Sequence, residues 1–130
     1  MRKTNAVCIF LLFVITLGFP RIDTVTADGW FASYGDISWE EEQAWLGSFA
    51  IALNRDPDMI GYIGFRVGKK DTLKKVKARI YRAKSFLIDK FKVEKSRIVI
   101  VNGGKDDETI IILQPVLKEL PPPVFSSLNY

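Results

Sequence analysis

Hydrophobic residues recur with helical spacing in two stretches of this chain. In the first, "SWEEEQAWLGSFAIAL" at 38–53, the apolar positions three and four residues apart are Leu46, Phe49, Ala50 and Leu53. Ser38 and Glu41 form a capping box, in which the hydroxyl accepts from a helix amide and the carboxylate reaches back. Pro57 cannot continue a helix. The pattern predicts a helix over about 39–53.

The second helical stretch follows Asp71 and Thr72, either of which can cap a helix, and extends to about Phe91. Its apolar stripe consists of Leu73, Val76, Ile80, Ala83 and Leu87. The other faces of this helix carry basic residues, namely Lys74, Lys75, Lys77, Arg79, Arg82, Lys84 and Lys90. We therefore predict an amphipathic helix over 72–91 with a basic outer surface.

Four segments have the branched and aromatic composition of strands, and they span 30–37, 59–67, 97–101 and 109–113. Gly61 and Gly64 in the second segment predict close backbone approach by a neighbour. The stretch "NGGKDDE" between the last two segments has the chemistry of a hairpin turn. We therefore expect the third and fourth strands to pair as an antiparallel hairpin.

The predicted order of elements is β-α-β-α-β-β. Two helices packed on one face of a mixed four-stranded sheet would bury both apolar stripes, which predicts an α+β two-layer sandwich. With 130 residues the chain is long enough for one domain, which we place at 28–115. The proline-containing end, 116–130, is predicted to be an extended tail or edge packing.

The first 27 residues have the pattern of a secretory signal peptide. Arg2 and Lys3 precede an apolar run of fourteen residues at 6–19, shorter than the ~18 that a bilayer span needs. Small residues up to Ala27 offer a cleavage point, and an uncleaved N-terminal anchor is the alternative. We expect export to the periplasm, the outer envelope or the extracellular space, with no transmembrane span in the mature chain.

The amino-acid composition excludes several kinds of functional site in the mature chain. The sequence has no histidine, and its one cysteine, Cys8, lies in the predicted signal peptide. A disulfide framework, a Cys/His zinc site and a His-based catalytic triad are therefore excluded. Glu40–Glu42 are interpreted as a helix cap, and the carboxylates of 105–109 as a polar turn rather than calcium ligands. We expect no enzyme activity, no cofactor and no metal site.

Charge is divided between the two halves of the mature chain. Residues 28–59 carry seven acids and one base, a net charge of −6, while residues 66–97 carry thirteen bases and three acids, a net charge of +10. A solvated basic face, partly neutralised by the acidic first helix, is the simpler interpretation. The alternative is an anionic envelope polymer such as teichoic acid, phospholipid headgroups or peptidoglycan. Nucleic acid is not expected for an exported protein.

Arg82 and Ala83 on the second helix, followed by "FKVEKSRIVIVNGG" at 91–104, carry a family resemblance. In these motifs and in the order of elements, residues 30–114 resemble the OmpA-like domain of bacterial envelope proteins. That family has an export signal, an arginine-alanine pair on this helix and a glycine-containing segment after it. The resemblance implies the β-α-β-α-β-β fold and a place in the cell envelope.

In the family that this chain resembles, an aspartate after a strand and the helix arginine hold the diaminopimelate of peptidoglycan. An arginine fork binds a carboxylate through two hydrogen bonds, and an aspartate binds an ammonium group. Arg82 matches the arginine, but Val67 stands near the position of the aspartate, and Asp71 would replace it only with a rearranged loop. The candidate ligand-binding residues are Arg82, Arg66, Lys69, Asp71 and Arg79.

Two hypotheses follow for an exported, non-enzymatic module of this kind. In the first, the domain is a structural or protein-interaction module that kept the fold and lost the ligand site, with a protein or a second copy of itself as partner. In the second, it binds peptidoglycan weakly through Arg82 and neighbouring bases. A salt bridge between Arg82 and an acid on the first helix would favour the first hypothesis.

Overall fold

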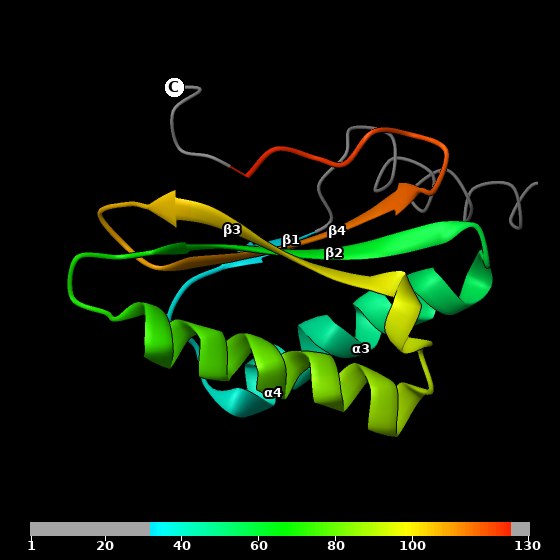
Figure 1. Ribbon diagram of the computed structural model, residues 1–130. Coiled ribbons are helices and arrows are strands. Elements are labelled where there is room, and N and C mark those ends of the chain that lie inside the picture. Colours follow the sequence, from blue (N-terminus) through cyan, green and yellow to red (C-terminus); the bar gives the residue numbers. More distant parts are fainter. Residues whose placement is uncertain (1–31, 126–130) are drawn as a thin grey trace, which may run out of the picture.

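The computed structural model describes residues 32–125, so the predicted signal peptide, residues 28–31 and residues 126–130 lie outside the described part. The elements in chain order are β1 (Ala32–Tyr34), α3 (Trp39–Arg55), β2 (Met59–Val67), α4 (Leu73–Phe91), the 3-10 turn η1 (Lys95–Arg97), β3 (Ile98–Lys105) and β4 (Ile110–Leu117). Both helices cover one face of a four-stranded mixed sheet (Figure 1). The predicted α+β two-layer sandwich with the order β-α-β-α-β-β is confirmed.

The strands lie side by side in the order β1-β4-β2-β3. β2 and β3 are parallel, whereas β4 is antiparallel to both of its neighbours, β1 and β2. The predicted hairpin between β3 and β4 is therefore wrong, because β2 lies between them. The chain after β3 crosses the end of β2, where any side chain on Gly68 would overlap the backbone of Glu108 and Thr109. In its central position β4 buries Ile111 and Leu113 completely.

Strand β2 has the predicted bounds, whereas the last two strands are longer than predicted. β3 begins one residue later than predicted and continues to Lys105 through the glycines of the expected turn. Its register with β2 shifts just before Lys105, and Gly104 there has a φ of 94°, a conformation that favours glycine. β4 continues to Leu117, two residues beyond the predicted domain boundary at 115.

Both helices begin at the predicted caps. The hydroxyl of Ser38 accepts a hydrogen bond from the amide of Glu41, and the hydroxyl of Thr72 accepts one from the amide of Lys75, each at 3.2 Å. α3 continues to Arg55, two residues beyond the prediction. These caps satisfy backbone amides that have no partner inside the helix, which fixes where each helix begins. Within residues 32–125, neither helix combines the length and hydrophobicity required to cross a bilayer.

The core lies between the sheet and the two helices. From the central strands, Ile63, Phe65, Ile111 and Leu113 face the helices and are at most 1% exposed. The helix residues packed against them are Leu46, Phe49, Ala50, Leu53, Val76, Ile80, Ala83 and Leu87. Both predicted apolar stripes are therefore buried, except that Leu73 at the start of α4 is 43% exposed.

The neighbours that approach Gly61 and Gly64 are side chains. A Cβ atom on Gly61 would lie 2.7 Å from Cδ1 of Leu53 and 3.0 Å from Cζ of Phe49. Gly64 faces the opposite side of the sheet, because its separation from Gly61 is an odd number of residues, and a Cβ atom there would overlap the ring of Phe125. Close approach is thus observed at both glycines, but the predicted approach by backbone is wrong.

Candidate functional site

Three loops meet at the end of the sheet where the parallel strands β2 and β3 finish, and they span 35–38, 68–72 and 106–109. The amide of Lys69 donates to the carbonyl of Asp107 at 3.3 Å, and the amide of Gly68 donates to the hydroxyl of Thr109 at 2.9 Å. Sheets with parallel strands commonly bind ligands beyond the carboxyl ends of those strands. This end of the molecule is therefore where a ligand site is expected.

A hollow of about 730 Å³ lies among these loops and the first turns of α4. Asp71 and Arg79, two of the predicted ligand residues, line it together with Lys70, Lys75 and Thr109. The carboxylate of Asp71 accepts a hydrogen bond from the hydroxyl of Thr109, which ties the loop before α4 to the loop before β4. Asp36, Asp107 and Glu108 also line it, so the hollow places four acids and three cations around the same volume.

Lys69 lies outside this hollow and lines a neighbouring one of about 580 Å³, which it shares with Asp71. Its Nζ atom is 3.0 Å from Oδ1 of Asp107, but the two side chains are 78% and 83% exposed. An ion pair between side chains this exposed contributes little to stability. Lys69 is therefore a solvated charge on the rim of the loop cluster.

The carboxylate of Glu42 is completely buried where α3 meets α4 and β1. Its Oε1 atom accepts a hydrogen bond from Nη2 of Arg82 at 3.1 Å. Its Oε2 atom accepts one from the hydroxyl of Tyr34 at 2.7 Å and lies 3.7 Å from Nη2 of Arg79. Because a buried carboxylate without partners is strongly unfavourable, these three side chains are what permit an acid at this position.

Arg82 is held in place for this ion pair by Trp39. The guanidinium carbon lies 4.1 Å from the centroid of the Trp39 ring, and Trp39 makes an edge contact with Phe86, with 5.3 Å between ring centroids. The side chain of Arg82 is 49% exposed, so the guanidinium is engaged by Glu42 while part of it remains in contact with solvent. The structure shows the salt bridge to an acid of the first helix that the sequence left open.

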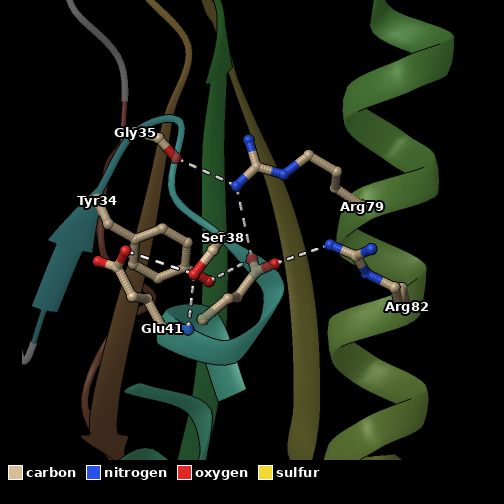
Figure 2. Close-up of polar contacts among 7 residues, drawn as sticks. Tyr34, Gly35, Ser38, Glu41, Arg79 and Arg82 are labelled. Carbon is tan, nitrogen blue, oxygen red and sulfur yellow. Dashed lines mark hydrogen bonds and ion pairs between the residues drawn. The ribbon is translucent and has the colours of Figure 1, made fainter. Parts of the chain in front are cut away.

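Arg79 connects the buried cluster to the large hollow. Its Nη2 atom donates to the backbone carbonyl of Gly35 at 3.1 Å, in addition to facing Glu42. Figure 2 shows Arg79 and Arg82 reaching from α4 toward the turn that carries Gly35 and Ser38. Arg79 therefore fixes the turn between β1 and α3 against α4, while the same side chain borders the hollow that Asp71 lines.

Tyr34 acts as a hydrogen-bond donor in this cluster. Burial raises the pKa of its hydroxyl well above the usual value, and the Glu42 carboxylate that accepts its hydrogen bond raises the pKa further. The nearby guanidinium groups of Arg79 and Arg82 lower it only in part. Tyr34 consequently stays protonated at physiological pH, as its hydrogen bond to Glu42 requires.

Arg66 lies on the other face of the sheet from the two arginines of α4. It follows Phe65, which faces the helices, and a Cβ atom on Gly103 would lie 3.0 Å from its Cγ atom. Its side chain is 9% exposed, and its Nε atom is 3.3 Å from Oδ2 of Asp106. Arg66 is therefore a buried, acid-paired residue of the outer sheet face.

The five predicted ligand residues do not form one site. Asp71 shares the large hollow with Arg79 and the smaller one with Lys69. Arg82 is paired with the internal carboxylate of Glu42, and Arg66 lies on the face of the sheet opposite the helices. Only the pair of Asp71 and Arg79 combines the acid and the arginine that the family resemblance implies, around one volume.

The sequence interpretation missed Glu42 and Tyr34, the centre of the polar cluster. Glu42 was grouped with the cap carboxylates of α3, yet it stands four residues before Leu46 and seven before Phe49, in phase with the buried stripe. An acid in that phase needs a buried cation as its partner. The position of Glu42 in the buried stripe was therefore the sequence feature that could have predicted the polar cluster.

Comparison with known proteins assigns no family to the chain. No protein-family model matches the sequence, and no curated protein matches it. The described part of the chain also contains no group of three or more metal-ligating side chains that could hold a metal ion. The OmpA-like resemblance therefore rests on the residues and the order of elements described above.

Proposed function

We propose that this protein is an exported, non-enzymatic interaction or structural module with an OmpA-like fold, in which the family ligand site has become a structural cluster. It works in the cell envelope or outside the cell, and its partner is a protein or a second copy of itself. The observation that carries the proposal is the ion pair between Arg82 and the buried Glu42.

Arg82 is already committed to a carboxylate inside the protein. A ligand carboxylate that bound the guanidinium of Arg82 would compete with Glu42. Because Glu42 is completely buried, it has no contact with water and depends on its cationic and hydrogen-bonding partners. The internal carboxylate has the advantage because it is fixed at 3.1 Å by the fold. This arrangement supports a module that has retained the arginine for stability.

The acid of the family site is also altered. Val67 ends β2 near the position where the resemblance places the aspartate, and the next available acid, Asp71, is hydrogen-bonded to the hydroxyl of Thr109. Asp71 therefore serves to join two loops. Loss of the aspartate and internal use of the arginine both favour a protein that does not recognise diaminopimelate.

A second candidate function is weak binding of peptidoglycan. It is favoured by the hollow of about 730 Å³ that Asp71 and Arg79 line together, with Lys70 and Lys75 beside them. A zwitterionic ligand there would meet Asp71, in the loop before α4, and Arg79, in the second turn of that helix. The partly exposed guanidinium of Arg82 would assist from the neighbouring turn.

Co-sedimentation with purified peptidoglycan sacculi at low and moderate salt separates the two functions. Residues 28–130 would be tested as wild type, as Asp71→Asn and as Asp58→Asn, a control at an exposed acid paired with Lys118. The proposal expects retention that falls to background as salt rises, equally in all three proteins, because only diffuse charge attraction is present. Salt-resistant retention that Asp71→Asn abolishes and Asp58→Asn preserves would establish the second function.

Export requires a separate test. The full chain would be produced in a bacterial host, the cells fractionated, and the amino-terminus of the protein sequenced. Cleavage near Ala27 and release from the cytoplasm are expected from the signal-peptide pattern. An intact amino-terminus in the membrane fraction would instead identify residues 1–27 as an anchor.

A further inference from the structure

Two buried aromatic residues, Tyr62 and Phe125, lie outside the main core cluster. Phe125 is 5% exposed, yet it packs on the face of the sheet opposite the helices, where the end of the described chain runs along the strands (Figure 1). Its ring stands where a side chain on Gly64 would be, and its carbonyl oxygen stands where a side chain on Gly103 would be. The two glycines belong to neighbouring strands, β2 and β3.

The sheet itself fixes the shape of this slot. Gly64 is paired in parallel register with Val101 on β3 and in antiparallel register with Ile112 on β4. The absence of side chains at the two glycines is a property of the strands, and the main core cluster does not include Phe125. The slot should therefore keep its form when the ring is removed.

Among residues 121–125, only the side chain of Phe125 is buried. The amide of Leu120 donates to the carbonyl of Leu117 at 2.9 Å, but no backbone hydrogen bond joins residues 121–125 to the other described residues. Pro121–Pro123 have no amide hydrogen to donate. Leu120 and Val124 are 51% and 73% exposed. A segment attached in this way can leave the sheet without breaking a strand ladder.

A hollow of about 280 Å³ continues the slot along the sheet. It lies between Val124 and Phe125 of the tail and side chains of β1, β2 and β4, among them Ser33, Arg66 and Ile112. Its lining offers an apolar floor with polar groups beside it. An extended peptide with one aromatic anchor fits such a surface, because the anchor fills the slot and the adjoining residues lie over the hollow.

We propose that Gly64 and Gly103 form a binding site for one phenylalanine of an extended, proline-containing peptide, and that Phe125 occupies this site from within the same chain. The ligand class is defined by the segment "PPPVF" that fills the site. The same segment supplied as a separate molecule binds once the internal phenylalanine is removed. This inference is independent of export and of polymer binding.

The test uses residues 28–130 with Phe125→Ala, labelled with ¹⁵N, and a synthetic peptide of residues 118–130 as the probe. We expect saturable shifts of the Gly64 and Gly103 amide signals on addition of the peptide. A control peptide in which the residue corresponding to Phe125 is alanine should bind about ten- to a hundredfold more weakly, since the contact area of a buried ring is lost. Equal binding of both peptides, or no saturable shift at either glycine, would overturn the proposal.

Two glycine variants complete the test. Adding Gly64→Ala to the Phe125→Ala chain should abolish binding of the peptide, because the new methyl group occupies the place of the ring. Adding Gly35→Ala should leave binding unchanged, since a Cβ atom there would lie 3.4 Å from the nearest atom, the carbonyl oxygen of Thr109. A Phe125→Ala chain that fails to fold by circular dichroism would also refute the proposal, because the slot would then exist only with its own occupant.

Discussion

Arg82 on α4 donates from Nη2 to Oε1 of Glu42 on α3 at 3.1 Å, and the carboxylate of Glu42 is completely buried. This contact joins the basic helix to the acidic one at the only fully buried acid among residues 32–125. It explains part of the charge asymmetry of the sequence as internal neutralisation. The arginine that the family resemblance marks for a ligand thus also has a structural partner.

Tyr34 should make the protein less stable in alkaline solution. Its pKa is raised in the folded state, first by burial and then by Glu42, so the folded protein keeps a proton that the unfolded chain loses near pH 10. Above that pH the free energy of unfolding should fall by up to about 1.4 kcal/mol per pH unit from this group. Urea unfolding at pH 9 and pH 11 measures the change.

The Tyr34→Phe variant is the control for this effect. It lacks the titrating hydroxyl, so its stability should fall less between the two pH values than that of the wild type. At pH 7 it should be less stable than the wild type by about 1 kcal/mol, because Glu42 loses one hydrogen bond. Identical pH dependence of the two proteins would show that Tyr34 titrates normally.

Arg97 should be important for stability although it lies in a short turn. Its guanidinium donates to the carbonyls of Leu53, Asp56 and Met59, with distances from 2.7 to 3.1 Å, and so satisfies the exposed end of α3. Replacing Arg97 with Met should lower the free energy of unfolding by about 2 kcal/mol or more. Lys95→Met, at an exposed position of the same turn, should change it by less than about 0.5 kcal/mol in parallel urea titrations.

Any side chain at position 61 should destabilise the protein. A methyl group there would lie 2.7 Å from Leu53 and 3.0 Å from Phe49, both completely buried on α3. We expect Gly61→Ala to lower the free energy of unfolding by about 1–3 kcal/mol through overpacking. Gly35→Ala, whose new methyl group would be 3.4 Å from its nearest neighbour, should leave the free energy of unfolding nearly unchanged. Thermal melts of both variants beside the wild type measure the two effects. A neutral Gly61→Ala would mean that α3 packs less tightly on β2 than these distances indicate.

Local pattern was sufficient for the elements but not for the pairing of the last strands. The capping residues Ser38 and Thr72 and the apolar stripes located both helices, because capping and amphipathicity are local properties. The turn chemistry after β3 suggested a hairpin, and only tertiary packing decides that β4 inserts between β1 and β2. Gly68 was the one local sign of this topology, because the absence of a side chain there lets the connecting loop cross the end of β2.

The candidate site was predictable only in part. Arg82 and Asp71 were identified by residue type and position, but their partners Glu42 and Thr109 lie 40 and 38 residues away in sequence. Pairing across such separations follows from the fold and not from local spacing. Arg66 was grouped with the same set by its charge, although strand alternation turns its side chain to the outer face.

If Arg82 stabilises the buried Glu42, a double-mutant cycle should reveal coupling between the two residues. Glu42→Gln, Arg82→Gln and the double variant would be compared with the wild type by urea unfolding, beside the same cycle for Asp58 and Lys118, an exposed pair that is also separated by 3.1 Å. We predict a coupling energy of about 1 kcal/mol or more for the first pair and below about 0.5 kcal/mol for the second. Equal, small coupling in both cycles would contradict a structural role for Arg82 and leave its guanidinium available for a ligand.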